Sequence, residues 1–259
     1  MPVKKECKLV KKEQLKENIF KFSVEAKEVV KEAKPGQFVE IRINKTVEPF
    51  LRRPISIYNM DKEKGILEFI FRIQGKGTTQ LSQKEEGDLI DIVGPLGYGT
   101  FNYEGYKNIS IIGGGIGVFP LYELAKNANK AKDINVNIFL GFRNEREVLL
   151  EEEFKKVSNN LVIATDDGSY AKKGYIINEL KEAVENEKPE IIFACGPLPL
   201  LKAVQNLAIE KNIPCQISLE EKMGCGLGVC LGCAVEVTNG GYEHVCKQGP
   251  VFDAKKVKI

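Results

Sequence analysis

Several features are scarce in this chain of 259 residues, and each scarcity excludes a class of protein. His244 is the single histidine, so a Rieske cluster, which needs two histidine ligands, is excluded. No apolar run is long enough to span a bilayer, and the N-terminal Met-Pro-Val-Lys-Lys-Glu lacks the apolar core of a signal peptide. The net charge is only +2, so we expect neither nucleic acid nor membrane among the partners.

Cysteine, by contrast, is plentiful, with seven residues and no secretion signal. This combination predicts a reducing, cytoplasmic location, where cysteines serve metal or redox chemistry rather than cross-links. Cys7 has no motif around it and is predicted to be a buried core thiol.

Four of the cysteines form a pattern near the C-terminus: Cys225, Cys230, Cys233 and Cys246. The spacing C-x4-C-x2-C with a later fourth cysteine is that of a plant-type [2Fe–2S] cluster. Glycines between the cysteines let the loop bend and bring N–H groups close to the sulfurs. Zinc and a disulfide framework are the alternatives, but structural zinc sites usually pair their cysteines in two separate knuckles.

The first hundred residues read as an all-β domain. Short apolar segments recur between turn residues at the spacing of a barrel or sandwich: 19–24, 38–43, 55–58, 67–73 and 89–93. From about Lys107 onward, strands at 108–112, 136–140, 161–164 and 191–194 alternate with helices at 120–127, 147–157, 176–185 and 198–210. Such alternation predicts a parallel sheet with right-handed crossovers.

Two glycine turns follow predicted strands of this second region. Gly113, Gly114, Gly115 and Gly117 follow the strand at 108–112, and Cys195, Gly196 and Pro197 follow the strand at 191–194. Turns of this kind at strand C-termini present N–H groups to a diphosphate, although tight-turn packing alone would also explain glycine there. The pair together favours nucleotide binding.

Two further motifs lie in the predicted barrel. Arg53-Pro-Ile-Ser56 and Gly75-Lys-Gly-Thr78 offer an arginine and hydroxyls near a glycine loop, which suits a diphosphate and a flavin edge. A plain hairpin turn at residues 75–78 is the alternative.

With Gly94-Pro-Leu-Gly97 and the two glycine turns, these motifs resemble the ferredoxin–NADP reductase superfamily. The four-cysteine tail and Val245-Cys-Lys-Gln-Gly-Pro-Val-Phe-Asp253 narrow this resemblance to the electron-transfer subunits of NAD-dependent (class B) dihydroorotate dehydrogenases. The resemblance covers essentially the whole chain. It implies a β-barrel FAD domain at 1–104, an α/β parallel-sheet NAD-binding domain at 105–214 and a small C-terminal iron–sulfur domain at 215–259.

The resemblance also implies which residues hold each cofactor. FAD is expected at Arg53, Pro54, Ile55, Ser56, Ile70, Phe71, Arg72, Gly77 and Thr78. NAD, as co-substrate, is expected at Gly113, Gly114, Gly115, Gly117, Cys195, Gly196 and Pro197, and the cluster at the four cysteines. Asp166 and Asp167 could touch ribose or cap a turn, and Arg143 could meet a 2′-phosphate or only adenine, so NAD and NADP stay open.

The resemblance implies a partner as well: an FMN-containing catalytic subunit that oxidises dihydroorotate, in a heterotetramer of two plus two. The cluster would relay electrons between the two flavins, and no residue of this chain is expected to transfer a proton. Three other functions remain open: a subunit of a hydrogenase, a subunit of a ferredoxin:NADP transhydrogenase, and a zinc-binding scaffold without enzymatic activity.

Overall fold

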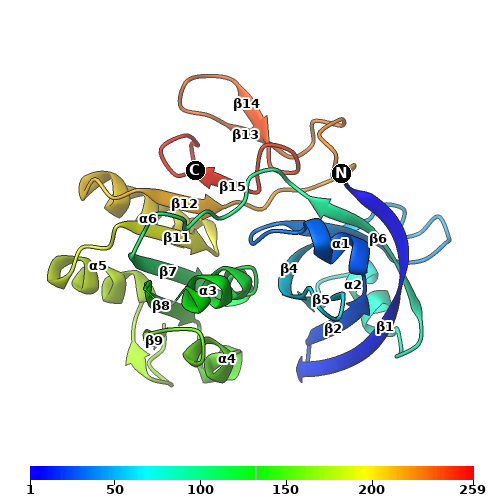
Figure 1. Cartoon of the computed structure of the whole chain (residues 1–259), viewed down its shortest axis with the longest axis horizontal. Coiled ribbons are helices and arrows are strands. Elements are labelled where there is room, and N and C mark those ends of the chain that lie inside the picture. Colours follow the sequence, from blue (N-terminus) through cyan, green and yellow to red (C-terminus); the bar gives the residue numbers. More distant parts are fainter. Residues whose placement is uncertain (132) are drawn as a thin grey trace. The chain divides into compact units, whose positions relative to one another are not determined.

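The computed structural model describes residues 1–131 and 133–259, which form two compact units (Figure 1). The barrel unit comprises Met1–Thr100, Glu220–Val235 and Glu243–Pro250. The sheet unit comprises Phe101–Leu219, Glu236–Tyr242 and Val251–Ile259. No helix in the described part of the chain combines the length and the apolar character needed to cross a membrane.

The barrel unit is built on a closed antiparallel barrel whose strands follow the order β1-β2-β5-β4-β3-β6. Their bounds are β1 Val3–Lys16, β2 Ile19–Glu25, β3 Phe38–Arg42, β4 Arg53–Asp61, β5 Ile66–Arg72 and β6 Leu89–Leu96. Phenylalanines of β2 and β5 pack edge to face inside it, with Phe22 and Phe71 ring centroids 5.1 Å apart. The predicted β-barrel is confirmed.

Three elements of this unit differ from the sequence prediction. Strand β1 is a full strand, although its outward positions are mostly lysine and glutamate and only Cys7 and Leu9 are fully buried. Two short helices, α1 (Lys27–Glu32) and α2 (Lys76–Ser82), interrupt the strands. Helix α2 begins inside the Gly75-Lys-Gly-Thr78 motif, so the alternative of a plain hairpin turn there is wrong.

The sheet unit contains a seven-stranded sheet in the order β10-β9-β8-β7-β11-β12-β15. The strands are β7 Asn108–Gly114, β8 Asn135–Phe142, β9 Asn160–Thr165, β10 Lys172–Lys173, β11 Ile191–Cys195, β12 Cys215–Ser218 and β15 Val251–Asp253. All pairs are parallel except β12 with β15. The helices are α3 Leu121–Lys130, α4 Glu151–Lys155, α5 Ile176–Asn186 and α6 Leu198–Glu210, with 3₁₀ turns η1 Gly115–Val118 and η2 Glu145–Glu147. The predicted parallel sheet is confirmed.

The C-terminal segment is shared between the two units. Its strands β12 and β15 belong to the large sheet, whereas residues 220–235 and 243–250 group with the barrel. A small hairpin joins β13 (Ala234–Glu236) to β14 (Tyr242–His244). The contacts of the segment predicted as an iron–sulfur domain, 215–259, are thus divided between the two units.

Candidate functional site

The first part of the site is the cysteine loop, in which Cys225 collects backbone donors. Its Sγ accepts N–H groups from Leu227 and Val229 at 3.3 Å and from Cys230 at 3.5 Å. Gly226 has φ +68° and Gly228 has φ +76°, values that glycine adopts without strain. These left-handed turns fold residues 226–230 back around the sulfur.

The other three cysteines lie close to the same loop. The Sγ atoms of Cys233 and Cys246 are 3.2 Å apart, and the N–H of Gly228 donates to Cys246 Sγ at 3.0 Å. A Cβ added at Gly224 would lie 3.3 Å from the Sγ of Cys230, so glycine leaves room for that sulfur. The structure thus brings together the four cysteines that the spacing singled out.

The cysteine loop changes the acidity of its thiols. Burial opposes ionisation of Cys225, but the three N–H donors outweigh it and lower the pKa of that thiol to about 6. Burial and the neighbouring Cys233 thiol raise the pKa of Cys246. Outside the loop, burial raises the pKa of Cys7 to about 11 and that of Cys215 to about 12, as expected of inert core thiols.

The donor set fits an iron–sulfur cluster. Four thiols are the usual ligands of such clusters, and N–H groups aimed at the sulfurs are their usual surroundings. Among the described residues, no three His, Cys, Asp or Glu side chains converge on a single ion position. A [2Fe–2S] cluster divides its four thiolates between two irons, so the pair formed by Cys233 and Cys246 fits one of them.

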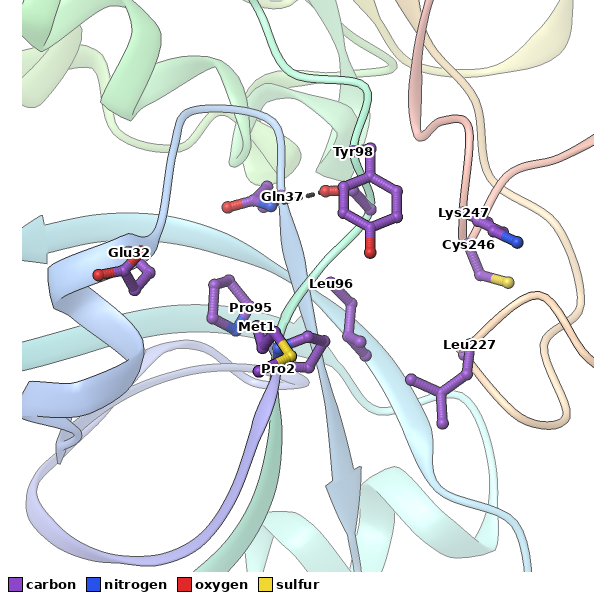
Figure 2. Close-up of a pocket in the computed structure, with 12 residues that line it drawn as sticks. Met1, Pro2, Glu32, Gln37, Pro95, Leu96, Tyr98, Leu227, Cys246 and Lys247 are labelled. Carbon is purple, nitrogen blue, oxygen red and sulfur yellow. Dashed lines mark hydrogen bonds between the residues drawn. The ribbon is translucent and has the colours of Figure 1, made fainter.

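The outer side of the loop is apolar and exposed. The exposed fractions are 50% for Leu227, 76% for Val229 and 62% for Leu231, whereas Met223 is half-buried. A groove of about 220 Å³ runs beside the loop and reaches Cys246. Figure 2 shows Cys246, Lys247 and Leu227 among its lining, together with Pro95, Leu96 and Tyr98.

The second part of the site joins the two barrel motifs. A Cβ placed on Gly77 would lie 2.6 Å from Nε of Arg53, so the guanidinium rests on the backbone at the start of α2. Arg53 also donates to the carbonyl of Arg52 at 3.3 Å and to that of Leu51. Thr78 Oγ1 accepts the N–H of Gln74 at 2.8 Å and holds the turn before α2. The fold therefore brings the arginine motif and the glycine motif together.

The remaining residues predicted to contact FAD point in different directions. Phe71 lies inside the barrel, with its ring 5.9 Å from that of Phe20, so only its backbone can face a ligand. Ile70 alternates with Phe69 and Phe71 along β5 and therefore points to the opposite face. Pro54, Ile55, Ser56 and Arg72 are half-buried on β4 and β5.

The third part of the site lies in the sheet unit, where the two glycine turns touch. A Cβ on Gly117 would lie 2.5 Å from Cα of Gly196, and a Cβ on Gly196 would lie 2.9 Å from N of Gly114. Strands β7 and β11 are neighbours, with Gly113 opposite Cys195. The chain order reverses between them, because β8, β9 and β10 lie on one side and β12 on the other. Ligands of open α/β sheets bind at such a switch point.

The loops that follow β8 and β9 show which of the two expected roles, contacting ribose or capping a turn, Asp167 has. The carboxylate of Asp167 accepts the N–H of Ser169 at 2.9 Å and its hydroxyl at 2.6 Å, so Asp167 caps a turn. The N–H of Asp166 donates to the carbonyl of Phe142 at 3.0 Å, which ties the two loops together. Burial raises the pKa of Asp166, and the positive charge of Arg143 opposes that rise.

Sequence reasoning missed one residue of the barrel unit, Glu40. Burial raises the pKa of its carboxyl to about 7, Arg52 opposes the rise, and Cys225 adds to it. No local signal identifies this residue, because a glutamate between Val39 and Ile41 looks like the solvent-facing position of a strand.

Comparisons with known proteins cover all three parts of the site. Residues 6–103 match the family model of the oxidoreductase FAD-binding domain, and residues 111–206 match that of the oxidoreductase NAD-binding domain. Residues 220–258 match the iron-sulfur cluster binding domain of dihydroorotate dehydrogenase B.

The chain is also similar to whole curated proteins. A protein of Desulforamulus reducens named dihydroorotate dehydrogenase B (NAD(+)), electron transfer subunit, is 38% identical over 244 residues, which are 93% of this chain and 92% of that protein. Its namesake from Caldanaerobacter subterraneus is 41% identical over 88% of each chain.

Solved structures share the fold. A chain from a structure of the NADH-dependent reduced ferredoxin-NADP oxidoreductase superposes with a TM-score of 0.86 at 32% identity, covering 98% of this chain and 90% of the other. The ferredoxin reductase of carbazole 1,9a-dioxygenase has a TM-score of 0.71 at 22% identity over 82% of this chain and 67% of its own, which supports the fold alone.

Proposed function

Because the chain belongs to the family of electron-transfer subunits of dihydroorotate dehydrogenase B, we propose that it passes electrons from a catalytic subunit through a [2Fe–2S] cluster and FAD to NAD+ in pyrimidine (UMP) biosynthesis. The observation that carries the proposal is the four-thiol loop, joined in one chain to FAD-binding and NAD-binding regions. NAD+ accepts two electrons as a hydride and the cluster carries one at a time, so the flavin supplies the conversion between them.

We assign the cluster to Cys225, Cys230, Cys233 and Cys246, whose sulfurs the loop already gathers. The FAD diphosphate is assigned to Arg53 and the start of α2 at Gly77 and Thr78, with Pro54, Ile55, Ser56, Ile70, Arg72 and the backbone of Phe71 beside the flavin. The nucleotide diphosphate is assigned to Gly113, Gly114, Gly115, Gly117, Cys195, Gly196 and Pro197, because their backbones meet at the switch point of the sheet. The chain's own role is to bind and orient these groups.

The partner in this proposal is an FMN-containing dehydrogenase subunit that holds the dihydroorotate site, in a complex of two plus two chains. The curated relatives are named as electron transfer subunits, which implies a separate catalytic subunit. FMN and the stoichiometry come from the family resemblance. Mass determination of the purified complex, with acid release of its flavins, tests both.

The function itself is tested on the isolated chain. We expect the purified chain to oxidise NADH with ferricyanide as an artificial acceptor, to release FAD rather than FMN in acid, and to leave dihydroorotate unchanged. Adding the FMN subunit should restore reduction of NAD+ by dihydroorotate. Turnover of dihydroorotate by this chain alone, or FMN as its only flavin, would refute the assignment.

A further prediction concerns where the partner docks. The partner's flavin can pass electrons to the cluster only if it lies nearby, and the exposed apolar side chains of Leu227 and Val229 belong to the cysteine loop. Exposed apolar patches of this kind often form protein interfaces. We expect Leu227→Asp or Val229→Asp to weaken association with the catalytic subunit about 100-fold, since an unpaired charge buried in an interface costs about 3 kcal/mol or more.

Co-purification and a binding titration measure this association. The matched control is Ile209→Asp on α6, where the native side chain is 52% exposed and lies outside the cysteine loop. If both loop variants bind the partner normally and retain iron and FAD, the docking surface lies on another face.

A second candidate function has one observation in its favour. The similarity to a chain of the NADH-dependent reduced ferredoxin-NADP oxidoreductase reaches 32% identity over 98% of this chain. In that case the chain would serve a transhydrogenase, and it would not restore dihydroorotate oxidation with any FMN subunit.

A further inference from the structure

Glu40 is a carboxylate in an unusual place. It lies on β3 between Val39 and Ile41, which both face the barrel core, so its own side chain points to the outer face of the barrel. An outward glutamate is normally solvated, yet Glu40 is only 1% exposed. Glutamate is almost never fully buried unless it is paired.

The carboxylate has no such pairing. Within the described part of the chain, neither Oε1 nor Oε2 of Glu40 has a hydrogen-bond partner. Arg52 directs its guanidinium to the carboxylate of Asp91 at 2.9 Å and to the backbone carbonyl of Glu40 at 3.3 Å. Arg53 is held over Gly77 and by backbone carbonyls.

The cysteine loop covers this carboxylate. A Cβ on Gly226 would lie 2.7 Å from Cγ and 2.9 Å from Oε1 of Glu40, so only a glycine backbone fits above it. Gly226 directly follows the cluster ligand Cys225 and lies in the same compact unit as Glu40. The carboxyl group is therefore held beside the cluster position with little water around it, so its charge acts there at close range when the group is ionised.

We propose that Glu40 acts on electron transfer through its charge: its buried carboxylate lowers the reduction potential of the cluster. Reduction adds one electron, and hence one negative charge, to the cluster. A fixed negative charge nearby opposes that addition, and more strongly where water is excluded. Net charge, hydrogen bonds to sulfur and solvent exposure are the protein's controls on cluster potential. This inference rests on the proposed function, in which a low-potential cluster favours onward transfer to FAD and NAD+.

The test is the midpoint potential of the cluster in the purified chain. It is measured by a redox titration, monitored by optical and EPR spectroscopy, in alkaline buffer, where the carboxyl carries its charge. Glu40→Gln keeps the shape and removes the charge. We expect the reduction equilibrium of the cluster to shift at least tenfold toward the reduced form, which is about 59 mV for one electron. The control is Glu17→Gln, which removes the same charge from an exposed position of the barrel unit. It should leave the cluster potential unchanged.

A structural role and an electrostatic role give different results. If Glu40→Gln retains iron, sulfide and FAD but leaves the potential unchanged, the proposal is overturned. If glutamine prevents cluster assembly, the comparison is made between Glu40→Asp and Glu40→Asn, which both shorten the side chain by one methylene and differ only in charge. Equal cluster potentials in these two variants would also overturn the proposal. The measurement needs neither the partner nor dihydroorotate. Failure of this proposal can therefore be distinguished from failure of the proposed pyrimidine function.

Discussion

Replacing Cys230 by alanine is expected to abolish the cluster. The iron and acid-labile sulfide content should fall from about two of each per chain to near zero, because one iron loses one of its thiolate ligands. The side chain of Cys230 is exposed and lies next to Gly224 and Gly232, so alanine creates no cavity in the core. FAD content should be retained, since Arg53 and Gly77 lie on other elements of the barrel.

Chemical analysis of iron and sulfide, with the visible spectrum, measures this loss. Cys215→Ala is the control: it removes a buried thiol from β12, outside the cysteine loop, and should keep the full cluster. Unchanged iron and sulfide in Cys230→Ala would mean that this cysteine is not a ligand, and a different fourth donor would have to be found.

Replacing Gly117 by alanine should have the second large effect, on NADH oxidation. The added methyl would overlap the backbone of Gly196, whose Cα lies 2.5 Å from the Cβ position, and backbone cannot move aside as a flexible side chain can. The two glycine turns must then separate, and the N–H groups that would meet the diphosphate shift with them. We expect kcat/KM for NADH to fall about 100-fold, the loss typical of a displacement of about 1 Å. Overpacking should also lower the free energy of unfolding by about 1–3 kcal/mol.

Steady-state oxidation of NADH with ferricyanide measures the first effect, and denaturant titration measures the second. Gly105→Ala is the control in the same unit. Its Cβ would meet no atom within 4 Å, and only its φ of +86° is unfavourable, which costs about 1 kcal/mol. It should lower stability slightly and leave NADH kinetics unchanged. If Gly117→Ala retains the wild-type kcat/KM for NADH, the glycine turns are not part of the nucleotide site.

Patterns that repeat over short distances could be interpreted without coordinates. The spacing of Cys225, Cys230 and Cys233 identified the cluster type. The ligands share one loop, so the number of residues between them is limited by the size of the cluster that they bind. Alternation of strands and helices from residue 108 onward identified the parallel sheet, since each element carries its own periodicity. Strand β1 was missed because its charged outward residues hide the few inward ones.

Contacts between distant segments were decided only by the tertiary structure. Arg53 rests on the backbone of Gly77, and Gly117 rests against Gly196, because barrel closure and strand order bring them together. The burial of Glu40 depends on the cysteine loop, which arrives from the other end of the sequence to cover β3. Sequence alone determined which chemical groups the chain carries, and the fold decided which of them meet, because burial and electrostatic environment depend on neighbours that no local pattern specifies.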